Sequence, residues 1–143
     1  MPGILIIAEH LNGSVRDITK ESIGAAASLK GSYGGPVIVV IPSSDPASIA
    51  ETVNLEGVDE IVTVKMAGDH FDPHVYEEVA IRIGEQAKSG LILFGHTVNG
   101  MACAAAVAAR LGAGFASDVL ALEAKDGEVI ATRGAYGNKV NLE

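Results

Sequence analysis

The chain has 143 residues and a formal net charge of −8; 48% of its residues are hydrophobic, but only 4% are aromatic. A chain of this length forms one domain, and its core must be built from aliphatic side chains, as in a sheet covered by closely packed helices. The acidic charge disfavours nucleic acids and anionic membranes as partners, because phosphate groups repel such a surface.

The first residues show neither a basic nor a cleavable leader pattern, and the chain enters an apolar run directly. The longest apolar runs fall well short of the roughly 20 residues that a membrane-spanning helix needs. We therefore expect a cytoplasmic protein with no membrane contact. Cys103 is the only cysteine, so no intramolecular disulfide can form.

Four apolar runs predict the strands of a parallel sheet. They cover residues 3–8 (GILIIA), 36–41 (PVIVVI), 58–64 (VDEIVTV) and 91–94 (LILF). Continuous aliphatic runs, such as the first, are typical of strands that are buried on both faces, and the third run alternates only partly. Strands of this kind need helical connections between them.

Helical patterns alternate with these runs. The first covers residues 19–29, with an inward stripe formed by Ile23, Ala26 and Ala27 beside the solvated Lys30, and we expect it to break at residues 31–35 (GSYGG). Two Asp-Pro pairs, at residues 45–46 and 72–73, predict capped helix starts. In the helix after the second pair, four apolar residues recur at spacings of four: Val75, Val79, Ile83 and Ala87. The last helix, residues 100–111, is almost entirely alanine.

At the end of the chain, the alternation of strand and helix patterns gives way to two strand-like runs joined by a turn. Residues 119–123 and 128–133 flank Lys125-Asp126-Gly127, and Asp-Gly between two strand-like runs predicts an antiparallel hairpin over residues 119–133. The final eight residues, 136–143, show no helix cap and no closing strand, which suggests a piece of a longer chain. The predicted fold class is α/β: a three-layer, open, mostly parallel sheet with helices on both faces and a C-terminal antiparallel hairpin.

Residues for catalysis or metal binding are scarce. The four histidines lie on separate elements; His70 and His74 are four residues apart but lie on either side of a helix start, so they do not form a zinc pair. Ser117-Asp118 near His96 does not make a nucleophile motif and is better assigned to a solvated turn. Cys103 lies among alanines, as a buried apolar residue would. We predict no catalytic residues and no metal site.

One crevice remains as a candidate site. Residues 95–100 (GHTVNG) place amides at a helix start, which could bind an anion; alternatively, Thr97 or Asn99 simply caps the helix, and we favour this second reading. Glu9 and His10 end the first strand at the same sheet edge, where they would face His96 and Thr97. The candidate residues at this edge are Glu9, His10, Gly95, His96, Thr97, Asn99 and Gly100.

Several segments, in order, resemble the alpha subunit of electron-transfer flavoproteins. They are residues 6–10 (IIAEH), 58–61 (VDEI), 94–97 (FGHT) with Gly100, 107–112 (VAARLG), Ser117-Asp118 and 133–138 (RGAYGN). The resemblance covers essentially the whole chain. One departure is Ala105-Ala106, where the family commonly has Pro-Arg, so an ion pair made by that arginine would be lost here.

The resemblance implies an N-terminal domain, residues 1–143, with an adenine nucleotide alpha hydrolase-like fold. In the family, such a domain mainly forms a scaffold that contacts a beta subunit, while FAD binds to a further alpha-subunit domain that is absent from this sequence. The heterodimer carries electrons from flavin dehydrogenases to an acceptor. We accordingly expect FAD in the full-length complex but no cofactor in this fragment, which could instead self-associate.

Two other classes share this type of sheet. A stand-alone adenine-nucleotide-binding domain like the universal stress proteins, or an enzyme that cleaves ATP to pyrophosphate, would have the same parallel fold. The first needs a fuller glycine-rich phosphate loop than residues 95–100, and the second needs a Ser-Gly-Gly-x-Asp-Ser run, which the sequence lacks.

Overall fold

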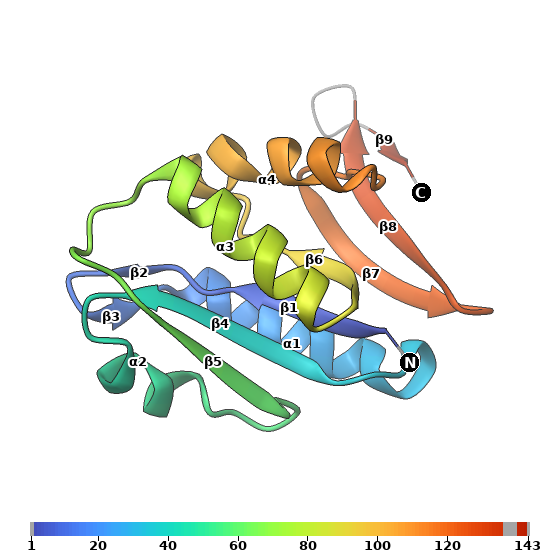
Figure 1. Cartoon of the computed structure of the whole chain (residues 1–143). Helices are drawn as coiled ribbons and strands as arrows, with labels where there is room; N and C mark the ends of the chain where they lie inside the picture. The colour runs from blue at the N-terminus through green and yellow to red at the C-terminus, as the bar shows by residue number, and fades with distance from the viewer. Residues whose placement is uncertain (1, 136–139, 143) are drawn as a thin grey trace.

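The computed structural model describes residues 2–135 and 140–142. In chain order the elements are β1 (Gly3–Ile7), β2 (His10–Leu11), β3 (Ser14–Val15), α1 (Asp17–Tyr33), β4 (Val37–Ser43), α2 (Pro46–Val53), β5 (Glu60–Lys65), α3 (Pro73–Gln86), β6 (Ser89–Leu93), α4 (Val98–Leu111), β7 (Val119–Lys125), β8 (Glu128–Ala135) and β9 (Val140–Leu142) (Figure 1). The predicted alternation of strands and helices is confirmed.

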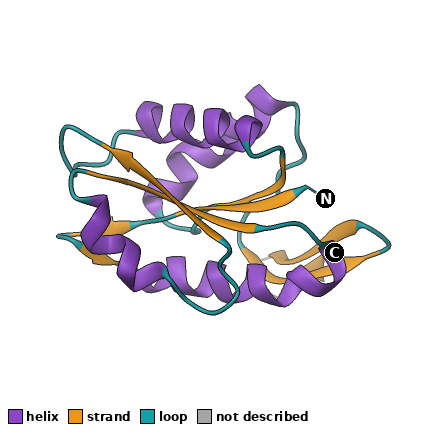
Figure 2. Cartoon of the chain, turned by 60° about the horizontal axis from the view of Figure 1, so that its bottom comes forward, coloured by secondary structure: helices purple, strands orange, loops and turns teal. Residues whose placement is uncertain are grey.

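The main sheet has the order β5-β4-β1-β6, and its strands are parallel. Because side chains alternate between the faces of a strand, Ile4 and Ile6 of β1 pack with α1 and α2, while Leu5 and Ile7 pack with α3 and α4. Figure 2 shows these helix pairs on opposite sides of the sheet. The predicted three-layer α/β architecture is therefore confirmed.

Helix α1 ends within the predicted break at residues 31–35, but it runs four residues past the predicted helix end at Leu29. It continues to Tyr33 and ends before Gly34, which has a φ of 78°. The four extra residues bring the Tyr33 side chain into the core, where the residue is only 9% exposed. Burying a side chain of this size is worth more than the roughly 0.5–1 kcal/mol that one glycine costs inside a helix.

Helix α3 begins as predicted, since the Asp72 carboxylate accepts from the backbone N of His74 at 2.9 Å and of Val75 at 3.4 Å. Its inward face is rotated from the predicted stripe, however. Tyr76, Ala80 and Gly84 are buried, whereas Val75 is 37% exposed. Gly84 accounts for this rotation: a Cβ there would meet Ile92 Cδ1 at 3.2 Å, so the glycine side of α3 can approach β6 most closely.

The remaining strands form two small antiparallel sheets. The predicted hairpin is confirmed as β7 and β8, with positive φ angles at Asp126 (54°) and Gly127 (82°), as a type I′ turn requires. The expectation of no closing strand was wrong, because β9 pairs with β8. The predicted motif at residues 136–138 lies outside the described residues. Strands β2 and β3 form a hairpin around Asn12-Gly13. This hairpin was not predicted, although Asn-Gly is a typical turn sequence.

Apolar residues of the β7–β8 hairpin, including Leu122, Ala124 and Val129, pack against the apolar core on the α1 and α2 side of the main sheet. The hairpin therefore extends the α1 side of the domain beyond the main sheet. Within the described residues, none of the helices is both long enough and apolar enough to cross a bilayer.

Candidate functional site

The sheet order creates a switch point between β1 and β6. The chain leaves β1 through α1 toward β4, while β6 pairs with the opposite edge of β1. In open parallel sheets, ligands bind outside the carboxyl ends of strands at such a point. Glu9 follows β1, and Gly95, His96 and Thr97 follow β6, so the structure brings both predicted segments to this edge.

Glu9 is the centre of the crevice. Its residue is 6% exposed, and Thr97 Oγ1 donates to its Oε1 at 2.5 Å, while Arg16 Nη1 donates to its Oε2 at 3.2 Å. Thr19 completes the set: Glu9 N donates to Thr19 Oγ1 at 2.8 Å, and that hydroxyl lies 3.3 Å from Glu9 O, to which it can donate. The buried carboxylate is thus paired and hydrogen-bonded, as a charge inside a protein must be.

Thr97 also caps α4. Its Oγ1 accepts from Gly100 N at 3.1 Å, which satisfies an amide at the helix start. The capping interpretation of residues 95–100 is therefore correct for Thr97, while Asn99 lies inside the first turn of α4. Two glycines allow the turn before α4 to pack closely against the Glu9 carboxylate and against the first turn of α4. A Cβ on Gly100 would meet Gly95 O at 1.8 Å, and a Cβ on Gly95 would meet Glu9 Oε1 at 3.1 Å.

The two histidines of the candidate set do not face each other. His10 Nε2 donates to Pro42 O at 2.6 Å, so its ring lies against the end of β4. His96 Nε2 lies 3.8 Å from Asp118 Oδ1, and both side chains are more than a third exposed. Of the four residues that were predicted to face one another across the crevice, only Glu9 and Thr97 do so. His10 is the first residue of β2 and pairs with Val15 of β3.

A second polar cluster, at the end of β4, was missed. The Asp69 carboxylate accepts from Ser44 N at 2.7 Å, from Ser44 Oγ at 2.6 Å and from Ser43 Oγ at 3.2 Å. The hydroxyl and amide of Ser44 hold the pKa of Asp69 below its usual range. Ser43 and Ser44, at the end of a buried strand, could have indicated this polar cluster from the sequence. These interactions tie the segment after β5 to β4, and each carboxylate oxygen already has a partner.

Two buried groups near the crevice are kept neutral. Cys103 is 1% exposed, and burial raises the pKa of its thiol to about 11. Burial likewise raises the pKa of Tyr76 to about 12, and its hydroxyl donates to Pro42 O at 3.3 Å. A thiol that stays protonated is a poor nucleophile. Within residues 2–135 and 140–142, no cluster of three or more His, Cys, Asp or Glu side chains is placed to hold a metal ion.

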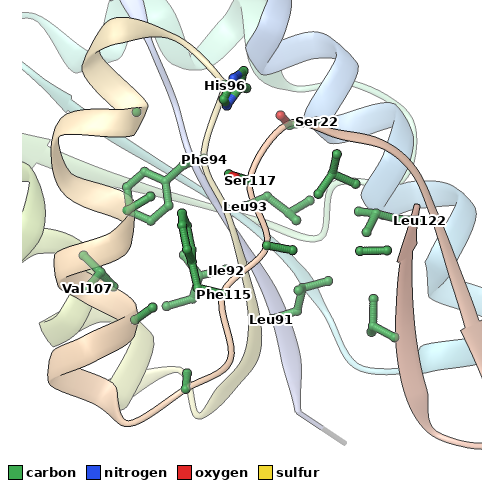
Figure 3. A pocket seen from close by; sticks show the side chains of 18 of the residues that line it. Ser22, Leu91, Ile92, Leu93, Phe94, His96, Val107, Phe115, Ser117 and Leu122 are labelled. Atoms are coloured by element: carbon green, nitrogen blue, oxygen red, sulfur yellow. The ribbon is translucent and has the colours of Figure 1, made fainter. Parts of the chain in front are cut away.

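A cavity lies beside the outer edge of β6, and Gly95, His96 and Gly100 of the candidate set are among the residues that line it. It has a volume of about 840 Å³ and is bounded by α1, α4, the hairpin and residues 113–118. Figure 3 shows Leu91 and Leu93 on one side of the strand, toward Leu122, and Ile92 and Phe94 on the other, with Val107 and Phe115. Its charged lining residues are Glu21, Glu85, Lys88 and Asp118. Such a lining suits an apolar occupant.

The sequence matches the family described as "Electron transfer flavoprotein domain" over residues 4–143. It is 37% identical to the electron transfer flavoprotein subunit alpha of Methylophilus methylotrophus, across 100% of this chain and 44% of that protein. The corresponding subunit of Bacillus subtilis is 29% identical, across 95% of this chain and 42% of that protein. A third relative is the lactate dehydrogenase (NAD(+),ferredoxin) subunit LctC of Acetobacterium woodii, 31% identical across 96% of this chain and 34% of that protein.

The chain thus spans less than half the length of these relatives, while nearly all of it is matched. The chain belongs to the electron transfer flavoprotein family.

Proposed function

We propose that this chain is the N-terminal, scaffolding domain of an electron transfer flavoprotein alpha subunit. The complete subunit would pair with a beta subunit and carry electrons from flavin dehydrogenases to an acceptor in the cytoplasm. The family match supports the electron-transfer role, and the name of the Acetobacterium woodii relative, a lactate dehydrogenase subunit, supports dehydrogenases as donors. FAD would be held outside these residues, and this domain would perform no catalysis of its own.

The observation that carries the scaffolding role is the closed crevice at the β1–β6 switch point. The position where a parallel sheet would receive a nucleotide phosphate contains the Glu9 carboxylate, linked to Thr97 at 2.5 Å. Thr97 also occupies the Gly100 amide at the start of α4. A phosphate there would lie against a negative charge and would lose an amide donor, so the crevice favours neither FAD nor an adenine nucleotide.

The cavity beside β6 also lacks the chemistry for a flavin pyrophosphate. Its lining is mainly apolar, and its acidic side chains, Glu21, Glu85 and Asp118, outnumber its basic ones, Lys88 and His96. Burying a pyrophosphate requires donors or cations that offset its charge. This cavity therefore gives no support to a FAD site within the domain.

Exposed apolar side chains support a role in assembly. On α4, Val98 is 79% exposed and Met101, three residues further along the helix, is 54% exposed. Large apolar groups in such positions are typical of surfaces that contact a partner. We propose that the beta subunit covers part of this surface, and that the isolated chain self-associates through it when no partner is present.

Titration of FAD against the purified 143-residue chain, followed by flavin fluorescence, tests this function. We expect no stoichiometric signal at micromolar flavin, whereas the Methylophilus methylotrophus alpha subunit with its beta partner, treated identically, should retain FAD. Parallel titrations with ATP and AMP test the stand-alone nucleotide-binding alternative. Stoichiometric FAD binding at micromolar or lower concentration, weakened by Glu9→Gln or His96→Ala, would show that the scaffold assignment is wrong.

A further inference from the structure

Two asparagines of the chain, Asn12 and Asn99, are followed directly by glycine, whereas the other asparagines precede leucine or lysine. The side-chain amide of an asparagine can be attacked by the backbone nitrogen of the next residue. A glycine in that position hinders the attack least, because it has no Cβ. Since the local sequence favours this reaction at both Asn-Gly pairs, a difference between them must come from the fold.

The first pair, Asn12 and Gly13, forms the turn of the β2–β3 hairpin, with φ angles of 51° and 76°. Both residues are exposed, and a Cβ on Gly13 would meet nothing within 4 Å. Among the described residues, the Gly13 amide donates no backbone–backbone hydrogen bond. The Asn12 side chain and the Gly13 nitrogen are therefore open to solvent, and closing a ring between them displaces no packed group.

The hairpin around this turn is small. Strands β2 and β3 have two residues each and form a two-stranded sheet of their own, separate from the main sheet. A two-stranded hairpin is marginally stable by itself, and segments with few buried contacts open locally at little cost in free energy. The backbone rotation that brings the Asn12 side chain to the Gly13 nitrogen is therefore accessible in the folded protein.

The second pair, Asn99 and Gly100, lies in the first turn of α4, where Gly100 is buried. The Gly100 nitrogen already donates to Thr97 Oγ1 at 3.1 Å. The surroundings are also tightly packed, because Gly95 O leaves no room for a Cβ on Gly100. The Gly100 nitrogen can attack the Asn99 side chain only after the first turn of α4 has opened and the cap from Thr97 has been lost.

We propose that Asn12 is a covalent modification site, at which the folded protein deamidates through a cyclic imide formed with Gly13. The Gly13 nitrogen loses its proton to water and attacks Asn12 Cγ. As this carbon–nitrogen bond forms, the bond to the side-chain nitrogen breaks, and that nitrogen takes up the proton and leaves as ammonia. Water then opens the ring at either carbonyl and gives aspartate or isoaspartate, with no oxidation or reduction. Either product adds one negative charge to the turn.

The isoaspartate product also changes the backbone, because the chain then runs through the former side-chain carbons. The left-handed conformation that closes a two-residue hairpin is lost with this longer connection. Strand β3 leads directly into Arg16, whose backbone N donates to Glu9 O at 3.0 Å and whose Nη1 donates to Glu9 Oε2 at 3.2 Å. Isoaspartate at Asn12 therefore loosens the hold of Arg16 on the buried Glu9 carboxylate.

Incubation of the 143-residue chain in mildly alkaline buffer, followed by peptide mass spectrometry, tests the site. Under native conditions we expect Asn12 to convert at least tenfold faster than Asn99, which reacts only when α4 opens. In concentrated urea the two asparagines should convert at the same rate, because each is then an unfolded Asn-Gly pair. Asn99 is thus the matched control within the same chain.

Hydrogen exchange tests the effect on the crevice. The modified protein is separated from the unmodified protein by anion exchange, since it carries one more negative charge. We expect the Arg16 amide to exchange at least tenfold faster in the isoaspartate form. The Asn12→Asp variant, which has the added charge but the normal backbone, should exchange as slowly as the unmodified protein, and the amides of β1 should be equally slow in all three.

Equal native rates at Asn12 and Asn99, or faster conversion of Asn99, would overturn the assignment of the site. Unequal rates in urea would also overturn it, by showing that sequence context and not the fold separates the two pairs. If the Arg16 amide exchanges at the same rate in the isoaspartate form and in the unmodified protein, the link from the turn to Glu9 is refuted. Fast exchange in Asn12→Asp would assign the effect to the added charge and refute the role of the lengthened backbone.

Discussion

The strongest prediction concerns Thr97, whose single hydroxyl links two parts of the fold. It accepts from Gly100 N at 3.1 Å and donates to the buried Glu9 carboxylate at 2.5 Å. Thr97→Val keeps the branched shape and removes both hydrogen bonds. Loss of a helix cap costs about 0.5–2 kcal/mol, and loss of a donor to a charged group costs about 1.5–3 kcal/mol. We expect the free energy of unfolding to fall by about 2–4 kcal/mol, since Arg16 still pairs with Glu9.

Urea unfolding followed by far-ultraviolet circular dichroism measures this loss, because the chain has no tryptophan for fluorescence. With a urea m-value of about 1–3 kcal/mol/M, a loss of about 3 kcal/mol lowers the midpoint by at least about 1 M. Thr97→Ser retains the hydroxyl and should lose less than about 1 kcal/mol. In a Glu9→Gln background, Thr97→Val should cost about 1 kcal/mol less than in the wild type, because the bond it removes is no longer charged.

Two results would refute this reasoning. If Thr97→Val lowers stability by less than about 0.5 kcal/mol, the hydroxyl is neither a cap nor a partner of Glu9. If the loss is large but identical in the Glu9→Gln background, Thr97 acts only as the cap of α4, and the Glu9 charge does not depend on it.

Three further predictions concern close packing, acid stability and the thiol. Gly100→Ala should unfold the domain or lower its melting temperature sharply, because its Cβ would lie 1.8 Å from Gly95 O; Gly114→Ala, whose Cβ meets nothing within 4 Å, is the matched control and should leave the melting temperature unchanged. Hydrogen bonds from Lys30 and the Val37 amide hold the pKa of Asp59 below its ordinary value of 3.8. A carboxyl group with a lowered folded pKa stabilises the fold above its unfolded pKa and loses that effect as pH falls through the folded value. The stability difference between wild type and Asp59→Asn should therefore be constant from pH 7 to 5 and shrink below about pH 4; a difference that grows on acidification would contradict this. Cys103, with its pKa raised by burial to about 11, should react with iodoacetamide at pH 8 only as fast as the domain opens, and much faster in urea; fast labelling of the native protein would show the thiol to be accessible.

Local patterns were sufficient to predict most of the elements. The aliphatic runs in β1 and β4 have one stable arrangement, since only a strand covered on both faces hides every one of their side chains. Asp72 before Pro73 marked the start of α3, and Asp126-Gly127 marked the β7–β8 turn, because each uses backbone groups within a few residues. The common sheet edge of Glu9 and Thr97 also followed from the strand–helix order alone.

Boundaries, faces and side-chain partners depended on distant contacts. Tyr33 extends α1 past Leu29 because the core can bury its side chain, and Gly84 turns the buried face of α3 toward Ile92. His10 was placed with the crevice from its position in the sequence, but its ring lies against Pro42. Strand β9 is only three residues long, too short to be recognised without its partner β8.

The sequence by itself determined the α/β class, the order of the strands along the chain and the family, because hydrophobic periodicity, capping residues and ordered motifs act over short distances. Only the tertiary structure decided that Glu9 closes the crevice and that β6 remains an apolar edge beside a cavity of about 840 Å³. Both features depend on which strands become neighbours in the sheet. Glu9 and Thr97, which meet in the crevice, are 88 residues apart in the sequence, so a local pattern cannot give the hydrogen bond between them.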